Sequence, residues 1–265
     1  MGQGILLKMQ TKLETEVKYF LNLGAENIEM NTLLGKQVSF TYLEKIHCVR
    51  CGRVTRKSFA QGYCYPCFTT APETGDCILR PELCQAQEGI SRDMKWSEEH
   101  CLQDHFVYLA LSSGVKVGVT RSTQIPTRWI DQGAWKAIRL ARTPNRYLAG
   151  RIEIALKAHM SDKTNWRRML TNNLAQNIDL KEEKEKASRL LDEEFASYIV
   201  PDNQVTEIPY PVLQYPEKVS SLGFDKTKFI DGILSGIKGQ YLMFEDSSVL
   251  NIRKHGGYLV AMNHG

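Results

Sequence analysis

Four cysteines arranged as two pairs have the residue type and the spacing that a zinc ion requires. Cys48 and Cys51 form one C-x2-C pair, and after twelve intervening residues Cys64 and Cys67 form a second. Zinc takes four thiolates at the corners of a tetrahedron, and each C-x2-C turn supplies two of them from one tight loop. Glycines beside both pairs allow the sharp backbone turns that such loops need. The sequence therefore predicts a structural zinc ion in a small zinc ribbon, with no coordination position left for chemistry.

A second group of potential metal ligands follows the ribbon. Cys77, Cys84 and Cys101 offer three thiols, with His105 or His100 as the fourth ligand. The separation of Cys77 and Cys84 along the chain does not by itself place both on one loop. Two interpretations remain open: a second zinc ion, or buried free thiols that pack as small apolar side chains.

The distribution of the cysteines also bears on the compartment. All seven lie between residues 48 and 101, and the chain shows neither a signal peptide nor an apolar run of the ~18 residues that a membrane span requires. Clustered cysteines in such a chain indicate metal ligands and not disulfides. We therefore expect a soluble cytoplasmic protein with one or two structural zinc ions.

Four short motifs follow one another between residues 106 and 153. They read FVYLAL, KVGVT, TRW and AGRIE, and they begin at residues 106, 116, 127 and 149. This order resembles the GIY-YIG nuclease superfamily, and most closely a branch whose second motif is written K-I-G-x-T. The whole chain also resembles a bacterial family known as a domain of unknown function, in which a cysteine-rich ribbon precedes such a unit.

The resemblance implies roles for five residues. By position, Tyr108 corresponds to the reactive tyrosine of the family's first motif, and Lys116 stands where a second tyrosine usually lies. Arg128 corresponds to the arginine that contacts the scissile phosphate, Glu153 to the single metal-binding carboxylate, and Asn165 to a polar residue that closes the site. Such a site hydrolyses a phosphodiester with Mg2+ or Mn2+: a tyrosine provides the base, arginine neutralises the phosphate, and the metal stabilises the leaving oxygen.

Each of these residues also has a purely structural interpretation. Tyr108 could be a buried strand aromatic, Arg128 and Glu153 an ordinary ion pair, and Gly118 a residue needed only for close packing. Two departures from the family pattern bear on activity. Lys116 replaces a tyrosine, and Gln132 stands where many members have a histidine or a tyrosine, whereas glutamine cannot titrate.

Positive charge is concentrated around these motifs. Residues 116–168 contain twelve Lys or Arg against three acidic residues, although the whole chain has a net charge of only +4. Such an excess indicates a surface that binds the phosphates of DNA or RNA. The residues predicted to bind nucleic acid are Arg121, Arg139, Arg142 and Arg146 in this stretch, with Arg53 and Lys57 in the ribbon. Aromatic residues interleave with the ribbon's basic residues, and they either stack on bases or cover the ribbon's own small core.

The elements that would position these residues indicate an α+β fold. Strand-like runs at 106–111, 115–120 and 135–141, a short helix from residue 127 and helical periodicity over 146–160 predict a GIY-YIG-like three-stranded sheet with packed helices. We expect five segments: a β-rich segment at 1–43, a cysteine-rich zinc-binding segment at 44–104, the GIY-YIG-like domain at 105–170, an amphipathic helix at 171–200, and a small all-β unit at 201–265.

Three functions from different classes fit these features. The first is a metal-dependent nuclease that acts on DNA or RNA, and the second is a zinc-containing nucleic-acid-binding protein that keeps the fold without cleavage. The third is an adaptor whose ribbon and β-rich ends bind other proteins. Magnesium-dependent cleavage would separate the first from the second, and salt-sensitive binding of nucleic acid would separate the second from the third.

Overall fold

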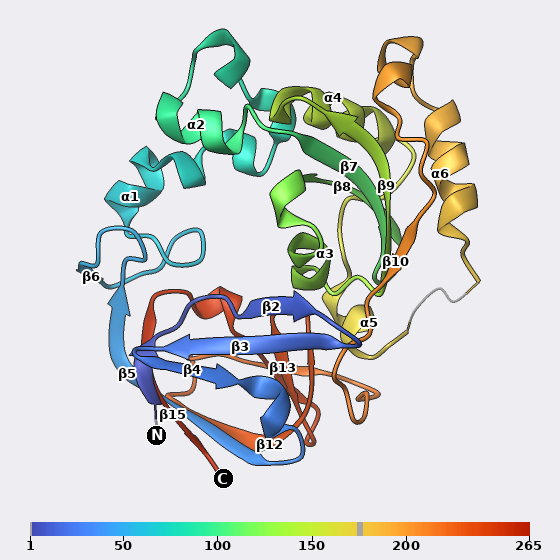
Figure 1. Cartoon of the computed structure of the whole chain (residues 1–265). Helices are drawn as coiled ribbons and strands as arrows, with labels where there is room; N and C mark the ends of the chain where they lie inside the picture. The colour runs from blue at the N-terminus through green and yellow to red at the C-terminus, as the bar shows by residue number, and fades with distance from the viewer. Residues whose placement is uncertain (1, 174–176) are drawn as a thin grey trace. The chain divides into compact units, whose positions relative to one another are not determined.

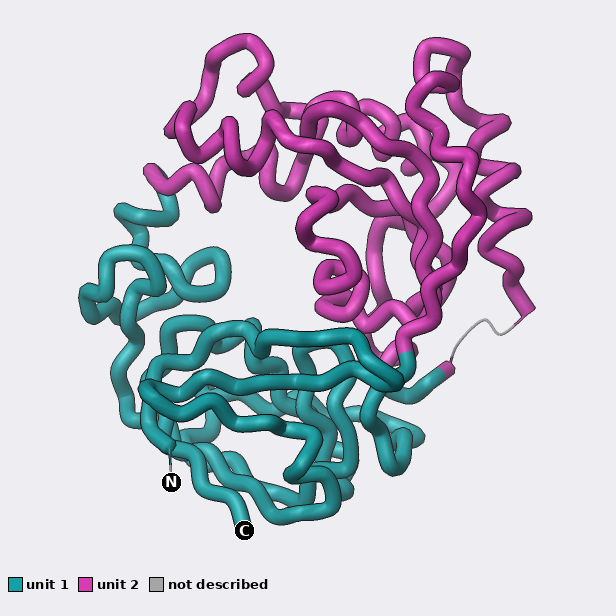
Figure 2. Tube along the Cα trace, viewed as in Figure 1, with its two compact units in different colours: residues 1–69, 170–172, 209–265 teal, residues 70–169, 173–208 magenta. Residues whose placement is uncertain are grey.

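The computed structural model describes residues 2–173 and 177–265, whose helices and strands are drawn in Figure 1. The fold is α+β, which confirms the predicted class. Two compact units divide the chain (Figure 2): unit 1 comprises residues 1–69, 170–172 and 209–265, and unit 2 comprises residues 70–169 and 173–208. Both β-rich ends of the chain thus contribute to unit 1.

Unit 1 contains two sheets among its described residues. The larger one runs, in spatial order, β1 (Gly2–Ile5), β15 (Tyr258–His264), β5 (Gln37–His47), β12 (Phe229–Lys238), β13 (Tyr241–Phe244), β14 (Ser248–Asn251) and β11 (Ser220–Leu222), with β6 (Val54–Thr55) paired to β5. The smaller one consists of β2 (Gln10–Leu13), β3 (Val17–Leu23) and β4 (Glu26–Glu29). Short helical elements accompany them: η1 (Met30–Leu33), α1 (Tyr65–Thr70) and η8 (Arg253–His255).

Strand β5 positions the first cysteine pair. It is held on both sides, because β15 and β12 each pair with it in antiparallel register. Its side chains Val38 and Phe40 are buried, as the alternation of apolar and polar residues in a strand with one core-facing side requires. Cys48 follows the end of β5 directly, and β6 pairs back onto the same strand, so the first cysteine pair lies in the connection between two paired strands.

Unit 2 is organised around one sheet. Its described strands, in spatial order, are β10 (Val205–Glu207), β9 (Lys136–Thr143), β7 (His105–Leu111) and β8 (Val115–Arg121). The three strands predicted from the motif region are therefore present, and β10 adds an edge strand from the segment that we predicted as a C-terminal β unit. Every residue of the central strand β7 is buried, as in a strand covered on both faces.

Several α-helices belong to unit 2 in addition to this sheet. They are α2 (Met94–His100), α3 (Thr127–Asp131), α4 (Arg146–Lys157), α5 (Trp166–Leu170), most of which belongs to unit 2, and α6 (Leu180–Arg189). Helices α4 and α6 pack against the strands, and their apolar residues Ile152, Leu156 and Leu180 share one core with Leu109 and Ile138 of the sheet. Asn145 begins α4 by accepting a hydrogen bond from Leu148 N, the usual cap of a helix start.

The structure differs from the predicted amphipathic helix at 171–200. Residues 174–176, including Leu174 of the predicted apolar stripe, lie outside the described residues. In the described part, α6 ends at Arg189 and a 3-10 helix, η7 (Glu193–Tyr198), follows after an extended Asp192. Few side chains of the highly charged α6 are buried. Because the helix ends at Arg189 and the chain changes direction before η7, Phe195 packs into the core of the sheet.

The cysteine-rich segment packs closely against α4 at Gly150. This segment contains short turns, η2 (Pro72–Thr74), η3 (Asp76–Ile78), η4 (Pro81–Leu83) and η5 (Ala86–Glu88), before α2. Turn η4 packs directly on α4, where a Cβ added at Gly150 would overlap the backbone of Pro81 and Glu82. Only glycine permits this approach, because backbone atoms cannot move aside as a flexible side chain can.

We predict that Gly150→Ala destabilises the protein. Helix propensity alone would favour alanine by about 1 kcal/mol at this helical position. The overlap with η4 should cost more than that, so the free energy of unfolding should fall by about 1–3 kcal/mol in a denaturant titration. Gly114→Ala is the control, because no atom lies within 4 Å of its added Cβ. A Gly150→Ala protein more stable than wild type would contradict the close approach of η4 to α4.

Candidate functional site

The first four cysteines come together in unit 1 as a candidate metal centre. The Sγ atoms of Cys48, Cys51, Cys64 and Cys67 all lie within 4.8 Å of one another, and those of Cys51 and Cys64 are 3.8 Å apart. The first pair lies between β5 and β6, and the second lies at the start of α1. This arrangement could hold a zinc ion with four thiolates, as the spacing predicted.

Glycines shape the backbone at both pairs. Gly52 has φ +72° and donates its N–H to Cys48 O at 2.9 Å. Gly62 has φ +138°, and a Cβ added there would lie 2.5 Å from Cγ1 of Val49. Both positions adopt conformations that side chains disfavour, so the two glycines allow the loops to bring their sulfurs together.

Hydrogen bonds from backbone N–H groups stabilise the thiolate form of Cys48. Burial raises the pKa of this thiol, but hydrogen bonds from the backbone of Cys51, Cys64 and Arg50 outweigh burial and lower the pKa to about 6. A thiol with such a pKa is largely deprotonated at neutral pH, and the thiolate is the form that binds a metal.

The ribbon's aromatic residues contact one another. Phe59 lies with its ring centroid 5.5 Å from that of Tyr65 and 5.6 Å from that of Phe68, and the Lys57 amine is 5.3 Å from the Phe59 centroid. Arg53 is exposed, and its carbonyl accepts a hydrogen bond from Cys48 N. Phe59 and Phe68 are half-buried against each other and favour the interpretation of rings that cover the ribbon's own core, whereas Tyr65 and Arg53 are exposed.

A second candidate metal centre lies in unit 2. The Sγ atoms of Cys77, Cys84 and Cys101 lie within 4.8 Å of one another. Cys77 belongs to η3, Cys84 follows η4, and Cys101 follows α2, so three separate turns bring the thiols together. The group could hold a metal ion, although its residues lack the paired spacing of the first group.

The two predicted histidine ligands are not part of this group in the described residues. His105 Nδ1 lies 2.6 Å from Gln103 O, and His100 Nδ1 lies 2.9 Å from Trp96 O. The His100 ring also stacks on Trp96 with centroids 4.1 Å apart. The Nδ1 contact leaves the buried Nε2 of His105 without a hydrogen-bond partner among the described residues, and His105 interacts electrostatically with Cys101, so His105 stays the predicted fourth ligand beside the three sulfurs.

Arg146 forms hydrogen bonds with the backbone around this cysteine group. Its guanidinium donates to Cys77 O at 3.4 Å and to His100 O at 3.1 Å. Hydrogen bonds from the Cys77 and Cys84 thiols, together with the charge of Arg146, lower the pKa of Cys101. Arg146 was predicted to bind nucleic acid, but its guanidinium hydrogen-bonds to carbonyls beside the second cysteine group.

Strands β7 and β8 position Tyr108 by close packing. Tyr108 lies opposite Gly118 in the register of these strands, and a Cβ added at Gly118 would be 2.6 Å from the tyrosine oxygen. The hydroxyl donates to Gln132 Oε1 at 2.8 Å, and burial raises the pKa of Tyr108. Gly118 is thus needed for packing, and that packing is what places the tyrosine hydroxyl beside Gln132.

The other predicted catalytic residues interact with this tyrosine and with one another. Burial and the nearby charge of Arg128 lower the pKa of the Lys116 amine to about 7. Glu153 lies on α4, where burial raises its pKa, and its Oε2 is 3.2 Å from Nζ of Lys157. Electrostatic interactions link Arg128 with Tyr108 and with Lys116, and link Glu153 with both. The structure therefore brings Tyr108, Lys116, Arg128 and Glu153 together from β7, β8, α3 and α4.

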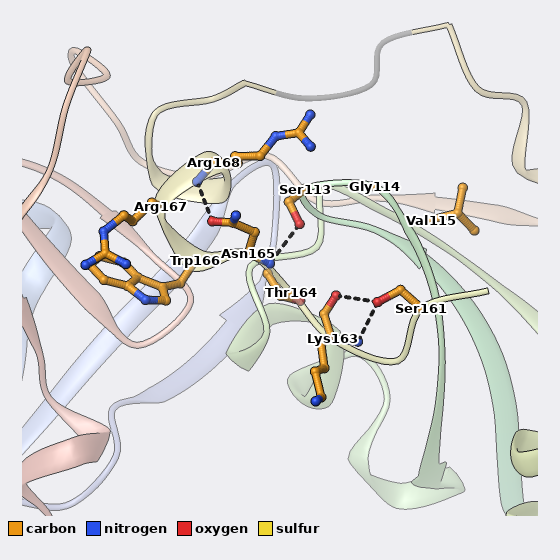
Figure 3. Close-up of a pocket in the computed structure, with 10 residues that line it drawn as sticks. All are labelled: Ser113, Gly114, Val115, Ser161, Lys163, Thr164, Asn165, Trp166, Arg167 and Arg168. Atoms are coloured by element: carbon orange, nitrogen blue, oxygen red, sulfur yellow. Dashed lines mark hydrogen bonds between the residues drawn. The ribbon is translucent and has the colours of Figure 1, made fainter. Parts of the chain in front are cut away.

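Asn165 has a different position. It lines a pocket of about 490 Å³ formed by the β7–β8 turn and residues 161–168, and Figure 3 shows its lining side chains. Asn165 N donates to Ser113 Oγ at 2.9 Å, and its Oδ1 accepts from Arg168 N at 3.2 Å. Asn165 thus organises this loop, and the four grouped residues are not among those that line the pocket.

The pocket carries basic residues that the sequence analysis did not single out. Lys163, Arg167 and Arg168 line it with exposed side chains, and the Arg167 guanidinium lies 4.4 Å from the ring centroid of Trp166 (Figure 3). Their signal in the sequence was the run NWRR at the end of the basic stretch, where cations and an aromatic ring adjoin.

Several predicted phosphate-binding arginines have partners within unit 2. Arg139 forms an ion pair with Asp202, and its guanidinium lies 5.4 Å from the Phe106 ring centroid. Arg142 forms an ion pair with Asp104. Arg121 is half-buried and interacts electrostatically with Cys101. The positive charge of the sequence is therefore partly neutralised locally, and exposed cations remain around the pocket of Figure 3.

Comparisons with known proteins give one match. The sequence model of a family described as "Protein of unknown function (DUF2797)" matches residues 35–260, which include both cysteine groups and all of unit 2. No curated protein and no solved structure matches the chain. Among the described residues, no helix is both long enough and apolar enough to span a membrane.

We predict about two zinc ions per chain in protein purified without chelator. Cys51→Ser and Cys84→Ser should each lose about one equivalent, because each removes one ligand from a different group. Elemental analysis of the folded proteins provides the measurement. His264→Gln is the control and should retain both ions, because this exposed histidine belongs to neither cysteine group. Wild-type protein that is folded and free of zinc would contradict both metal centres.

Proposed function

This chain belongs to the DUF2797 family, and we propose that its unit 2 is a divalent-metal-dependent phosphodiesterase that acts on DNA or RNA. One observation carries the proposal: Tyr108, Lys116, Arg128 and Glu153, from four separate elements, interact in one group. Buried ionisable residues are costly, and pKa values perturbed by burial and by specific neighbours are frequent at catalytic sites.

Glu153 is the candidate metal ligand. Its buried Oε2 pairs with Nζ of Lys157 at 3.2 Å and has no further polar partner among the described residues, so a lone pair of the carboxylate could bind a metal ion. Carboxylate oxygen suits Mg2+ or Mn2+, which commonly bind through one or two protein carboxylates and substrate phosphate oxygens. A bound ion would stabilise the negative charge that develops on the leaving oxygen. Such an ion would compete with Lys157 for the Glu153 carboxylate.

Lys116 is the candidate general base. A lysine whose pKa is lowered to about 7 is partly neutral at physiological pH, and a neutral amine can accept a proton from the attacking water. This role would account for the lysine at a position where the resembling family has a tyrosine. Tyr108 donates to Gln132 and cannot easily ionise when buried, so it is better suited to orient groups than to act as base.

Arg128 is the candidate phosphate contact. It is half-buried on α3, and its charge interacts with both Tyr108 and Lys116. A guanidinium can donate two hydrogen bonds to one phosphate in a fixed geometry. A phosphate held there would be close to the Lys116 amine and the Glu153 carboxylate. The proposed base and the proposed metal ligand would then act on the same phosphate.

A nucleic-acid-binding protein without cleavage is the second candidate. The observation that favours it is the internal pairing of the group, since Gln132 accepts from Tyr108 and Lys157 lies against Glu153. Such pairing holds the residues in place without a substrate. Exposed Lys163 and Arg167, with Trp166, would supply phosphate contacts and base stacking in either case.

We predict that the basic pocket binds nucleic acid electrostatically. Affinity for DNA or RNA oligonucleotides should fall steeply between about 50 and 200 mM salt, because phosphate contacts release counterions. Replacing Arg167 and Arg168 together by alanine should reduce the slope of log affinity against log salt by roughly 2. Fluorescence anisotropy measures both effects, and Lys181 and Arg189 of α6, replaced together, form the control pair. No binding at low salt would exclude both candidate functions.

We predict that Glu153→Gln abolishes cleavage and preserves binding. The substitution keeps the side-chain size and removes the charged metal ligand, so the rate with Mg2+ should fall at least about 100-fold. Arg128→Ala should lose both activities, since arginine contacts the phosphate before and during reaction. Cleavage of labelled DNA and RNA is measured on gels, with Glu185→Gln on α6 as the control.

Lys116 distinguishes the two candidates. Wild-type cleavage should rise as pH increases through about 7, because the neutral amine is the active form, and Lys116→Met should remove cleavage while the fold persists. Cleavage that survives in Lys116→Met would refute the base assignment. A wild-type protein that cuts neither DNA nor RNA with Mg2+ or Mn2+ would leave only the binding function.

A further inference from the structure

The ammonium of Lys157 lies between two carboxylates. Its Nζ is 3.2 Å from Oε2 of Glu153 and 3.3 Å from Oδ2 of Asp162. Glu153 precedes Lys157 by one helical turn on α4, whereas Asp162 belongs to the loop that follows this helix. One cation is therefore shared by the candidate metal ligand and by an acidic residue outside the candidate catalytic group.

The two carboxylates differ in their access to water. Glu153 is 7% exposed, whereas 37% of the Asp162 side chain is exposed. A buried carboxylate without a cation costs far more free energy than an exposed one, because water stabilises the charge of the latter. The charges of Asp162 and Glu82 also repel that of Glu153, and the charge of Lys157 attracts it. Glu153 therefore needs a positive charge beside it, whereas Asp162 does not.

Hydrogen bonds to β8 fix the loop that carries Asp162. Val117 N donates to Ser161 O at 3.0 Å, and Lys116 forms a parallel bridge with Ser161. Within the loop, Ser161 Oγ accepts from Lys163 N at 3.0 Å and donates to Lys163 O at 3.2 Å (Figure 3), so the residues on both sides of Asp162 are joined. The loop therefore holds Asp162 beside the strand of Lys116, with which its carboxylate interacts electrostatically.

A divalent ion at Glu153 would change the position of Lys157. Two cations beside one carboxylate repel each other, so the ion would displace the ammonium from the Glu153 oxygen. Lys157 already contacts Asp162, and its flexible side chain can keep this contact while it leaves Glu153. The ammonium then stays paired throughout. Asp162 thus lowers the free energy that is needed to vacate the metal-binding oxygen.

We propose that Asp162 is a positioning residue of the metal centre, which holds the ammonium of Lys157 while a divalent ion occupies the Glu153 carboxylate. Asp162 acts through Lys157 and does not itself bind the ion. This inference rests on the proposed function, because Glu153 is the metal ligand in both. Without the Asp162 carboxylate, Glu153 would be the remaining acidic partner of Lys157 among the described residues, and the ion would have to break that pair outright.

Binding of Mn2+ to the full chain tests the proposal independently of cleavage. The titration uses zinc-loaded protein, since thiolates prefer Zn2+ to Mn2+, and electron paramagnetic resonance measures the free Mn2+. Affinity should fall about fivefold in Asp162→Asn, as for the loss of an ion pair, and Asp162→Glu should restore most of it. Glu207→Gln is the matched control: it removes a carboxylate 2.9 Å from Lys136 in the same unit and should leave the affinity unchanged.

A double-mutant cycle shows whether Asp162 acts through Lys157. In a Lys157→Met protein no ammonium competes with the ion for Glu153. Asp162→Asn should therefore change Mn2+ affinity at least about threefold less in that protein than in wild type. The titrations are made at about pH 8 to keep the carboxylates ionised. Circular dichroism checks that each variant is folded.

The outcomes separate this inference from the proposed function. Wild-type protein whose Mn2+ binding is unchanged in Glu153→Gln overturns both the metal role of Glu153 and this inference. Binding that depends on Glu153 but is unchanged in Asp162→Asn overturns this inference alone. Equal effects of Asp162→Asn in wild type and in Lys157→Met also overturn it, because Asp162 would then act on the ion directly.

Discussion

The position of α4 is the constraint on which both centres of unit 2 depend. Arg146, Gly150 and Glu153 are four and three residues apart, so they lie on one face of this helix. Arg146 contacts the second cysteine group, Gly150 allows the close approach of η4, and Glu153 interacts electrostatically with the buried Lys116 of β8. A single helix therefore connects a candidate metal centre with the candidate catalytic group, and η4 can approach it only where no side chain intervenes.

The two cysteine groups differ in how their ligands are brought together. In unit 1, two C-x2-C pairs lie on tight loops, and local hydrogen bonds such as Gly52 N to Cys48 O shape the loops. In unit 2, three thiols come from separate turns that pack on α2 and α4, with Cys84 and Cys101 in a small core of their own. The first group is thus a product of local geometry, whereas the second depends on tertiary packing, and its three thiols adjoin a pocket.

Buried polar residues distinguish the sheet of unit 2 from an ordinary core. Lys116, Glu153 and Tyr108 are each less than a tenth exposed, although an unpaired buried charge costs several kcal/mol. Their neighbours offset this cost, since Tyr108 donates to Gln132 and Glu153 lies against Lys157. A core built only for stability would use apolar residues at these positions, and this cost is the physical motive for the proposed chemical role of the group.

Local spacing in the sequence determined the first cysteine group, the β7–β8 hairpin, the short helix ended by Gly133 and the helix α4, because hydrogen bonds between near neighbours set these features. The sequence did not reveal the pairing of β1 with β15, the edge strand β10, or the ion pairs of Arg139 with Asp202 and Arg142 with Asp104. These contacts join residues far apart in the chain, and no short-range pattern specifies them. For the same reason, tertiary structure alone decided that Arg146 contacts the second cysteine group and that the exposed cations gather around Asn165.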